Sequence, residues 1–77
     1  SLMMNTAGFP DFIGIKRKKS SYDVIGIEVK KNGWLDGEER EKGRFLLDKK
    51  IFSKILIAKK GKKRGEIEYI NFKEKYE

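Results

Sequence analysis

Two short runs near the N-terminus are rich in β-branched and other apolar residues. They are FIGIKR at residues 12–17 and VIGIEVK at residues 24–30, and each contains a glycine. The segment between them, KKSSYD, is polar and slightly long for a tight turn. Runs of this length and composition on either side of a polar loop predict an antiparallel β-hairpin.

A helix is expected from about residue 37 to residue 50. Asp36 is followed three residues later by Glu39, the pattern of an N-cap with a capping box. Acidic residues fill the first turn and lysines the last, as the helix dipole prefers. The apolar stripe is thin. Gly43 costs about 1 kcal/mol relative to alanine in a helix, and it therefore suggests close packing against a strand.

The second half of the chain contains two further strand candidates. KILIAK, residues 54–59, is a short continuous apolar run of the kind found in buried strands. Because it follows a strand and a helix, it should lie parallel to residues 24–30 in a βαβ unit. The basic turn GKKRG, residues 61–65, leads into a last strand, EIEYINF, residues 66–72. The expected fold is an α/β domain with a mixed sheet in the order β-β-α-β-β.

Size and composition narrow the chemistry that is open to the chain. A chain of 77 residues buries only about 60–65% of the surface that it exposes when unfolded. We therefore expect one small domain, residues 8–77, that gains stability as a homodimer. Residues 1–7 are interpreted as a short N-terminal arm that partly derives from cloning. With neither cysteine nor histidine in the sequence, a metal site would need oxygen ligands, which favours Mg²⁺, Mn²⁺ or Ca²⁺ over Zn²⁺.

The location of the protein is also expected from the sequence. No apolar run approaches the roughly 20 residues of a membrane span, and the N-terminus does not have the pattern of a signal peptide. We therefore expect a cytoplasmic protein with no membrane partner and no small-molecule cofactor.

Basic residues outnumber acidic residues by 19 to 12, which gives a net charge of +7. This excess favours a polyanionic partner, and DNA is the one that we expect. The alternative is a lysine-rich surface of the kind that thermophilic proteins have. Two basic clusters are expected to contact phosphates, one in the hairpin and one near the last turn: Arg17, Lys18 and Lys19, and Lys59, Lys60, Lys62, Lys63 and Arg64.

Side chains alternate between the two faces of a strand. We therefore expect one face of the second strand to pack against the helix and the other face to carry polar groups. The expected core face consists of Ile25, Ile27 and Val29, and the opposite face of Val24, Gly26, Glu28 and Lys30.

The register of the hairpin predicts a pair of carboxylates. If the turn is centred between Lys19 and Ser20, the numbers of paired residues sum to 39, and Asp11 lies opposite Glu28. Two opposed carboxylates repel each other, and a divalent cation between them would relieve that repulsion. The alternative is that Asp11 caps a turn while Glu28 belongs to a solvated salt-bridge face.

The residues beside this pair suit a Mg²⁺ site with a catalytic role. Mg²⁺ is held by one or two carboxylates with waters and substrate oxygens. Asp11 and Glu28 are therefore the candidate ligands, completed by the backbone carbonyl of Val29. Lys30 would place a positive charge beside the ion, where it could lower the pKa of an attacking water or stabilise developing negative charge.

Pro10-Asp11, Glu28-Val29-Lys30, the helix and the strand KILIAK together resemble the PD-(D/E)xK nucleases, which have the restriction-endonuclease-like fold. The similarity covers roughly residues 8–72 and is greatest to the VRR-NUC and archaeal Holliday junction resolvase-like branch. The resemblance implies hydrolysis of DNA phosphodiester bonds with Mg²⁺ or Mn²⁺. It also implies that Asp11 and Glu28 are metal ligands and that Lys30 is the catalytic lysine.

The sequence departs from that family at two places. The helix that usually begins these domains is absent or supplied by a partner chain. The glutamine that often lies early in the helix is also absent, and Glu39 or Lys42 could take its place as an accessory residue.

The expected function is cleavage of branched or structured DNA, and the alternative is a catalytically silent DNA-binding or dimerisation module. An RNA-directed relative is disfavoured because such enzymes use histidine. Trp34 is expected in the core or at a dimer interface, with base stacking as its alternative role.

Overall fold

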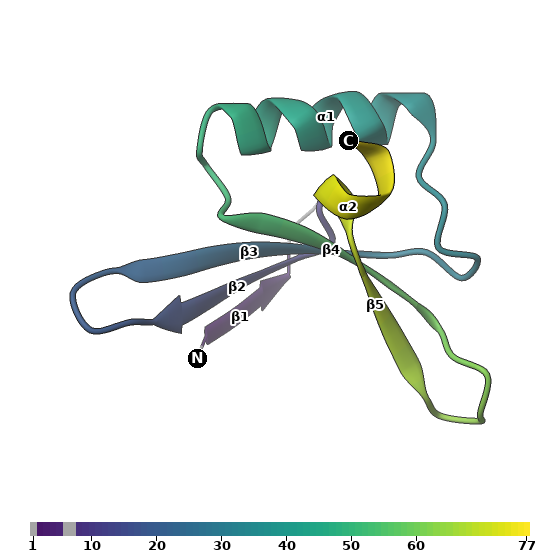
Figure 1. The fold of residues 1–77 in the computed structure, drawn as a ribbon. Coiled ribbons are helices and arrows are strands. Elements are labelled where there is room, and N and C mark those ends of the chain that lie inside the picture. Colours follow the sequence, from purple (N-terminus) through teal and green to yellow (C-terminus); the bar gives the residue numbers. More distant parts are fainter. Residues whose placement is uncertain (1, 6–7) are drawn as a thin grey trace.

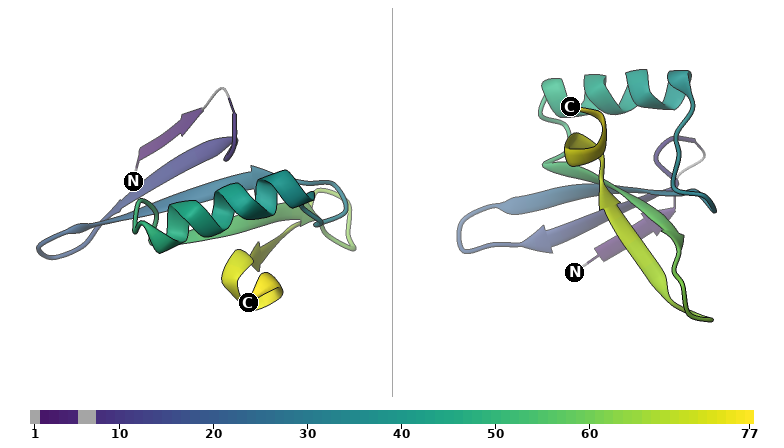
Figure 2. Two further views of the ribbon diagram at one scale, coloured as in Figure 1. Left: turned by 90° about the horizontal axis from the view of Figure 1, so that it is seen from above. Right: turned by 45° about the vertical axis from the view of Figure 1, so that its right-hand side comes forward.

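The computed structural model describes the backbone of residues 2–5 and 8–77 and the side chains from Gly8 onward. Both helices lie on the same side of a twisted mixed sheet, and the longer one crosses the middle of that sheet (Figures 1 and 2). The elements are, in chain order, β1 (Leu2–Asn5), β2 (Phe12–Arg17), β3 (Tyr22–Val29), α1 (Gly37–Asp48), β4 (Lys54–Lys60), β5 (Ile67–Asn71) and α2 (Phe72–Tyr76).

The α/β class with a mixed sheet is confirmed, but the complete order of elements differs from the predicted one. The chain follows the order β-β-β-α-β-β-α. It contains β1 and α2, which were not predicted, in addition to the expected elements. β1 falls within the segment expected to be an arm. α2 begins at Phe72, where the last strand was expected to end, because Asn71 Oδ1 accepts hydrogen bonds from the backbone N–H groups of Lys73 and Glu74 and caps the helix.

The strands lie side by side in their sequence order, and only β3 and β4 are described as parallel neighbours. Helix α1 is the crossover between these two, as the βαβ pattern predicts. The register of the β2–β3 hairpin is also confirmed, because Phe12 pairs with Ile27 and their numbers sum to 39. The Lys18 N–H closes the turn by donating to the Ser21 carbonyl at 2.8 Å.

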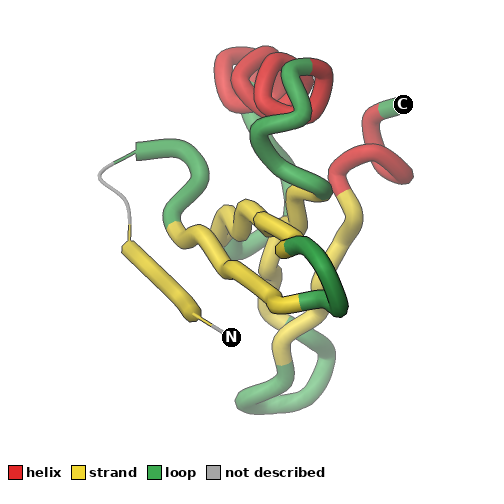
Figure 3. The backbone as a smooth tube through the Cα atoms, turned by 90° about the vertical axis from the view of Figure 1, so that its left-hand side faces the viewer, coloured by secondary structure: helices red, strands yellow, loops and turns green. Residues whose placement is uncertain are grey.

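The predicted assignment of the two faces of β3 is wrong. The face turned toward α1 carries Gly26 and Glu28, and Glu28 is only 6% exposed. Ile25, Ile27 and Val29 lie on the opposite face, where Val29 is 53% exposed. Figure 3 shows both helices on one side of the strands and none over the other. The chain therefore buries the face that carries its carboxylate.

Strand β4 explains this orientation. Gly26 pairs with Ile55, and Glu28 pairs with Ile57, so these residues share the helix-covered face. Ile55 and Ile57 are fully buried. The orientation of β3 therefore follows from its neighbour: the burial of Ile55 and Ile57 under the helices turns Gly26 and Glu28 to the same side of the sheet.

The hydrophobic core lies between α1, α2 and the sheet. Its buried members are Leu35, Phe52, Ile55, Ile57 and Phe72. Gly43 was expected to pack against a strand, but its close neighbour is Phe72, the first residue of α2. A Cβ atom added at Gly43 would lie only 2.6 Å from Cε2 of that ring.

Helix α1 is capped as predicted. Asp36 Oδ1 accepts from the Glu39 N–H at 2.8 Å, and Glu39 Oε1 accepts from the Asp36 N–H at 3.0 Å, which completes the capping box. Within residues 2–5 and 8–77, no helix is both long enough and apolar enough to cross a lipid bilayer.

Candidate active site

Asp11 and Glu28 lie side by side where β2 begins and β3 ends. The Asp11 N–H donates to Glu28 Oε1 at 2.9 Å, and the Val29 N–H donates to Asp11 Oδ2 at 2.9 Å. Each carboxylate is therefore held by the backbone of the other residue's strand. The structure brings Asp11 and Glu28 together, as expected from a hairpin register in which the numbers of paired residues sum to 39.

Pro10 and Gly26 support this arrangement from the helix-covered side. Pro10 is buried, and the Phe9–Pro10 peptide bond is cis. A Cβ atom added at Gly26 would lie 3.0 Å from Cγ of Pro10. Proline can approach β3 this closely because Gly26 has no side chain, and the approach sets the position of Asp11, which follows it directly.

Glu28 is the buried carboxyl of the site. Burial, a hydrogen bond with the Glu39 side chain and the charge of Asp11 together raise the pKa of Glu28 to about 7, although the hydrogen bond from the Asp11 N–H acts in the opposite direction. At neutral pH Glu28 is therefore protonated for much of the time, and its protonated form can donate a hydrogen bond to Glu39.

Glu39 links the start of α1 to the site. Its Oε2 lies 2.9 Å from Lys30 Nζ, while Oε1 belongs to the capping box. Burial by itself raises the pKa of Glu39, but the hydrogen bonds from Lys30, the Asp36 backbone and Glu28 outweigh it and lower the pKa. The hydrogen bond with Glu39 in turn raises the pKa of Lys30.

The two accessory candidates are separated by the structure. Glu39 joins Glu28 and Lys30, whereas Lys42 lies outside this group and its Nζ is 3.3 Å from Glu38 Oε1 on the exposed face of α1. The sequence predicted the capping role of Glu39, and the resemblance named Glu39 and Lys42 as alternative accessory residues without deciding between them. The contact of Glu39 with Lys30 depends on the placement of α1 over the sheet.

The donor set fits an ion that accepts few protein ligands. Two adjacent carboxylates and a strand carbonyl match Mg²⁺, which keeps several waters and is bound through one or two carboxylates. The described part of the chain contains no group of three or more acidic side chains arranged to hold a metal. A site for Mg²⁺ would therefore have only two carboxylate ligands, Asp11 and Glu28. The Val29 carbonyl would be a third ligand, and water and substrate would fill the other positions.

The two basic clusters lie at opposite ends of the sheet. Arg17 pairs with Tyr22 at the start of β3, and Glu28 lies six positions further along the strand, which corresponds to about 20 Å. The hairpin cluster is therefore remote from the carboxylates.

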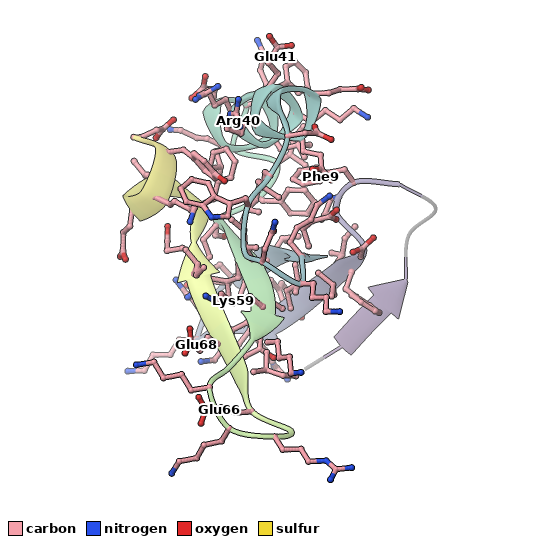
Figure 4. All side chains as sticks on the ribbon, turned by 90° about the vertical axis from the view of Figure 1, so that its right-hand side faces the viewer. Phe9, Arg40, Glu41, Lys59, Glu66 and Glu68 are labelled. Atoms are coloured by element: carbon pink, nitrogen blue, oxygen red, sulfur yellow. The ribbon has the colours of Figure 1, made fainter. Side chains whose placement is uncertain are left out.

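The second cluster lies at the same end of the sheet as the site, because β4 runs parallel to β3 and the 61–65 turn follows its end. Lys59 is paired with Glu68 at 3.9 Å, and Figure 4 shows this pair between β4 and β5, with Glu66 nearer the turn. The exposed basic residues of this end are Lys60, Lys62, Lys63 and Arg64.

Trp34 was expected in the core or at a dimer interface, and the structure does not place it in the core. Its side chain is 61% exposed, whereas the neighbouring Leu35 is only 3% exposed. Leu35 therefore anchors the loop between β3 and α1, and Trp34 points away from the core.

The raised pKa of Glu28 has a consequence for stability. Its folded-state pKa of about 7 lies above the ordinary 4.5, so the folded state binds this proton more tightly than the unfolded state does. The free energy of unfolding should therefore fall by about 1–3 kcal/mol between pH 5 and pH 8, because one pKa unit corresponds to about 1.4 kcal/mol. Urea unfolding in EDTA measures this change.

Glu28→Gln is the matched variant for that measurement, because glutamine replaces the protonated carboxyl with a neutral group of the same shape. The variant should lose most of the dependence on pH between 5 and 8. Glu39 does not interfere, because its lowered pKa affects stability only as the pH falls below about 4.5. Equal slopes for the wild type and the variant would contradict the assignment to Glu28.

Comparison with known proteins gives no match for this chain, whether with family models, with curated proteins or with solved structures.

Proposed function

We propose that the protein is a metal-dependent nuclease that hydrolyses DNA phosphodiester bonds, with Asp11, Glu28 and Lys30 as its active site. The observation that carries the proposal is the pair of reciprocal hydrogen bonds that holds Asp11 and Glu28 together at one end of the sheet. Two carboxylates held this close repel each other unless a proton or a cation lies near them. The raised pKa of Glu28 means that protonation of this carboxyl relieves the repulsion in the free protein.

Each side chain has a separate task in this proposal. Asp11 and Glu28 hold the cation, and Mg²⁺ or Mn²⁺ supplies charge neutralisation at the scissile phosphate when it is bound. Lys30 directly follows β3, two residues beyond Glu28, and its ammonium orients water and stabilises developing negative charge. Glu39 holds this ammonium in place through its ion pair at 2.9 Å.

The order of the other elements and the positions of the basic residues also support the proposal. β2, β3, α1, β4 and β5 form the proposed restriction-endonuclease-like core, in which the carboxylates lie where the hairpin meets the parallel pair. The exposed basic residues of the 61–65 turn lie at the same end, where they would bind the phosphates that flank the cut. Branched or structured DNA is the proposed substrate, because the basic hairpin at the far end would reach a separate DNA arm.

A homodimer is the proposed assembly. The core of this 9.0 kDa chain contains few fully buried side chains, and Val29, Ile67 and Tyr69 are each more than half exposed. A second copy would add the buried apolar area that a domain of this size lacks. Sedimentation equilibrium is expected to give about twice the mass of the chain, and a monomer at micromolar concentration would contradict the proposal.

A catalytically silent DNA-binding module is the second candidate function. The observation that favours it is the network around Glu39, which occupies the Lys30 ammonium and forms a hydrogen bond with Glu28. In this alternative the carboxyl groups and the lysine are purely structural.

One assay separates the two functions. A four-way junction, a flap and a plain duplex are each incubated with the protein in Mg²⁺, in Mn²⁺ or in EDTA. The nuclease is expected to cut the junction or the flap in either metal and to leave all three substrates intact in EDTA. Salt-sensitive binding without cutting in any metal would overturn the nuclease and assign the silent module.

A further inference from the structure

Trp34 is an exposed aromatic side chain on a well-anchored loop. The residues on either side of it are buried. Gly33 has a φ of +79°, and a Cβ atom added there would lie 2.9 Å from Cδ of Lys59. The loop therefore passes close to β4 and turns sharply just before it presents the indole to solvent.

Hydrogen bonds hold this loop on both sides of the indole. The Trp34 N–H donates to Asn32 Oδ1 at 3.0 Å, and the Leu35 N–H donates to the Tyr76 hydroxyl at 2.9 Å. Arg40 Nη1 also donates to the Leu35 carbonyl at 2.7 Å. The indole is thus exposed because the backbone holds it outward. A rigid aromatic side chain loses little conformational entropy when a planar ligand stacks on it.

A positive charge accompanies the ring. Lys75 Nζ lies 3.6 Å from the centroid of the indole, which is a cation–π contact. The ammonium lies over one face of the indole, so a base would stack on the opposite face, while the phosphate of the same nucleotide could pair with the charge.

The loop also begins at the proposed active site. Trp34 follows Lys30 by four residues, and the Gly33 N–H donates to the Lys30 carbonyl at 2.9 Å, which closes the turn between them. Lys31, in the same turn, is exposed. A nucleotide on Trp34 would therefore lie at the same end of β3 as Lys30, the group proposed to act at the scissile phosphate.

We propose that Trp34 and Lys75 form a stacking site for one unpaired nucleotide of a DNA substrate next to its cleavage site. This inference rests on the proposed function and narrows its substrate class. Bases inside a duplex are covered on both faces by their neighbours, so the indole stacks on an unpaired base in preference to a paired one. The preferred DNA is therefore a flap, a fork or a single strand beside a duplex, and a continuous duplex lacks the recognised feature.

The single tryptophan of the chain makes this site directly observable, because stacking of a base quenches indole fluorescence. The protein is titrated in EDTA, where cleavage does not occur, with an oligothymidine strand, a flap and a blunt duplex of equal length. Strong quenching is expected with the strand and the flap and little with the duplex. An RNA strand of the same sequence is included, and RNA binding at least tenfold tighter than DNA would overturn the assignment of DNA.

Variants test the role of the ring. Trp34→Ala is expected to weaken binding of the flap by about 5- to 100-fold, as the loss of one base-stacking side chain does, while binding of the blunt duplex stays the same. Trp34→Phe should retain most of the affinity. Phe45→Ala is the matched control, because Phe45 is similarly exposed, at 55% against 61%, and also has a lysine near its ring, with Lys49 Nζ 6.0 Å from the ring centroid, but belongs to α1.

The outcomes separate this inference from the proposed function. Equal affinity of the wild type and Trp34→Ala for the flap overturns the stacking site, as does a fluorescence change that follows protein concentration in the absence of DNA, which would place Trp34 in a dimer contact. Metal-dependent cutting that is unaffected by Trp34→Ala leaves the nuclease intact and removes the stacking site. Stacking without cutting in any metal retains the site and removes the nuclease.

Discussion

Replacing Lys30 with alanine is expected to slow metal-dependent DNA cleavage by about 100- to 1,000-fold, the loss typical of removing one preorganised group that stabilises charge in the transition state. The fold should survive this change. Lys30 and Glu39 are partly exposed, at 30% and 16% of their side-chain surface, and such an ion pair contributes at most about 1 kcal/mol. Single-turnover cleavage of a labelled flap in Mg²⁺ measures the effect.

Lys31→Ala is the control for this variant. It removes the same charge from the adjacent position, but Lys31 is exposed and forms no ion pair among those found in the described residues. Its cleavage rate should stay within about threefold of the wild type, as expected for one screened surface charge. Equal losses in both variants would show that the overall basic charge controls the rate, and they would contradict the special role of Lys30.

Replacing Gly43 with alanine is expected to destabilise the protein, although alanine is favoured over glycine in helices by about 1 kcal/mol. The added Cβ would lie 2.6 Å from Cε2 and 2.7 Å from Cζ of Phe72. Phe72 is fully buried and packs against Tyr76 with ring centroids 5.1 Å apart, so its ring has little room to move. Overpacking of a core costs about 1–3 kcal/mol, and we expect this cost to exceed the gain in helix propensity.

The measurement for Gly43→Ala is thermal unfolding, with a decrease in Tm of about 5–15 °C for a domain of this size. Gly37→Ala in the same helix is the matched control. A Cβ atom added at Gly37 meets only Arg40 Nη2 at 3.6 Å, which is an ordinary contact. Its Tm should stay the same or rise. A higher Tm for Gly43→Ala than for the wild type would contradict the tight contact between α1 and α2.

Glu39 shows where local sequence patterns stop being informative. The capping box explained this residue completely from Asp36 and the helix start, and the structure confirms that box. The same side chain also contacts Lys30 and Glu28, two strand residues that lie about ten positions earlier in the chain. No spacing rule links them, because the contact depends on how the crossover helix is set over the sheet.

The faces of β3 were misjudged, and the core was the wrong place for Trp34, for a related reason. An apolar side chain is expected inside, yet the anchoring residue of the loop is Leu35, and only the packed structure shows which of the two neighbours is buried. Likewise, Ile25, Ile27 and Val29 are more apolar than Gly26 and Glu28, but the second set faces the core.

The sequence by itself determined the features that depend on neighbouring residues: the hairpin and its register, the capped helix, the parallel strand and, through that register, the pairing of Asp11 with Glu28. These follow from turn chemistry, capping and the alternation of side chains, which act over a few residues. Only the tertiary structure decided which face of the sheet is buried, that Glu39 joins the site and that the hairpin cluster lies remote from it. Each of these depends on packing between distant segments, where the burial of Ile55, Ile57 and Phe72 outweighs local preference.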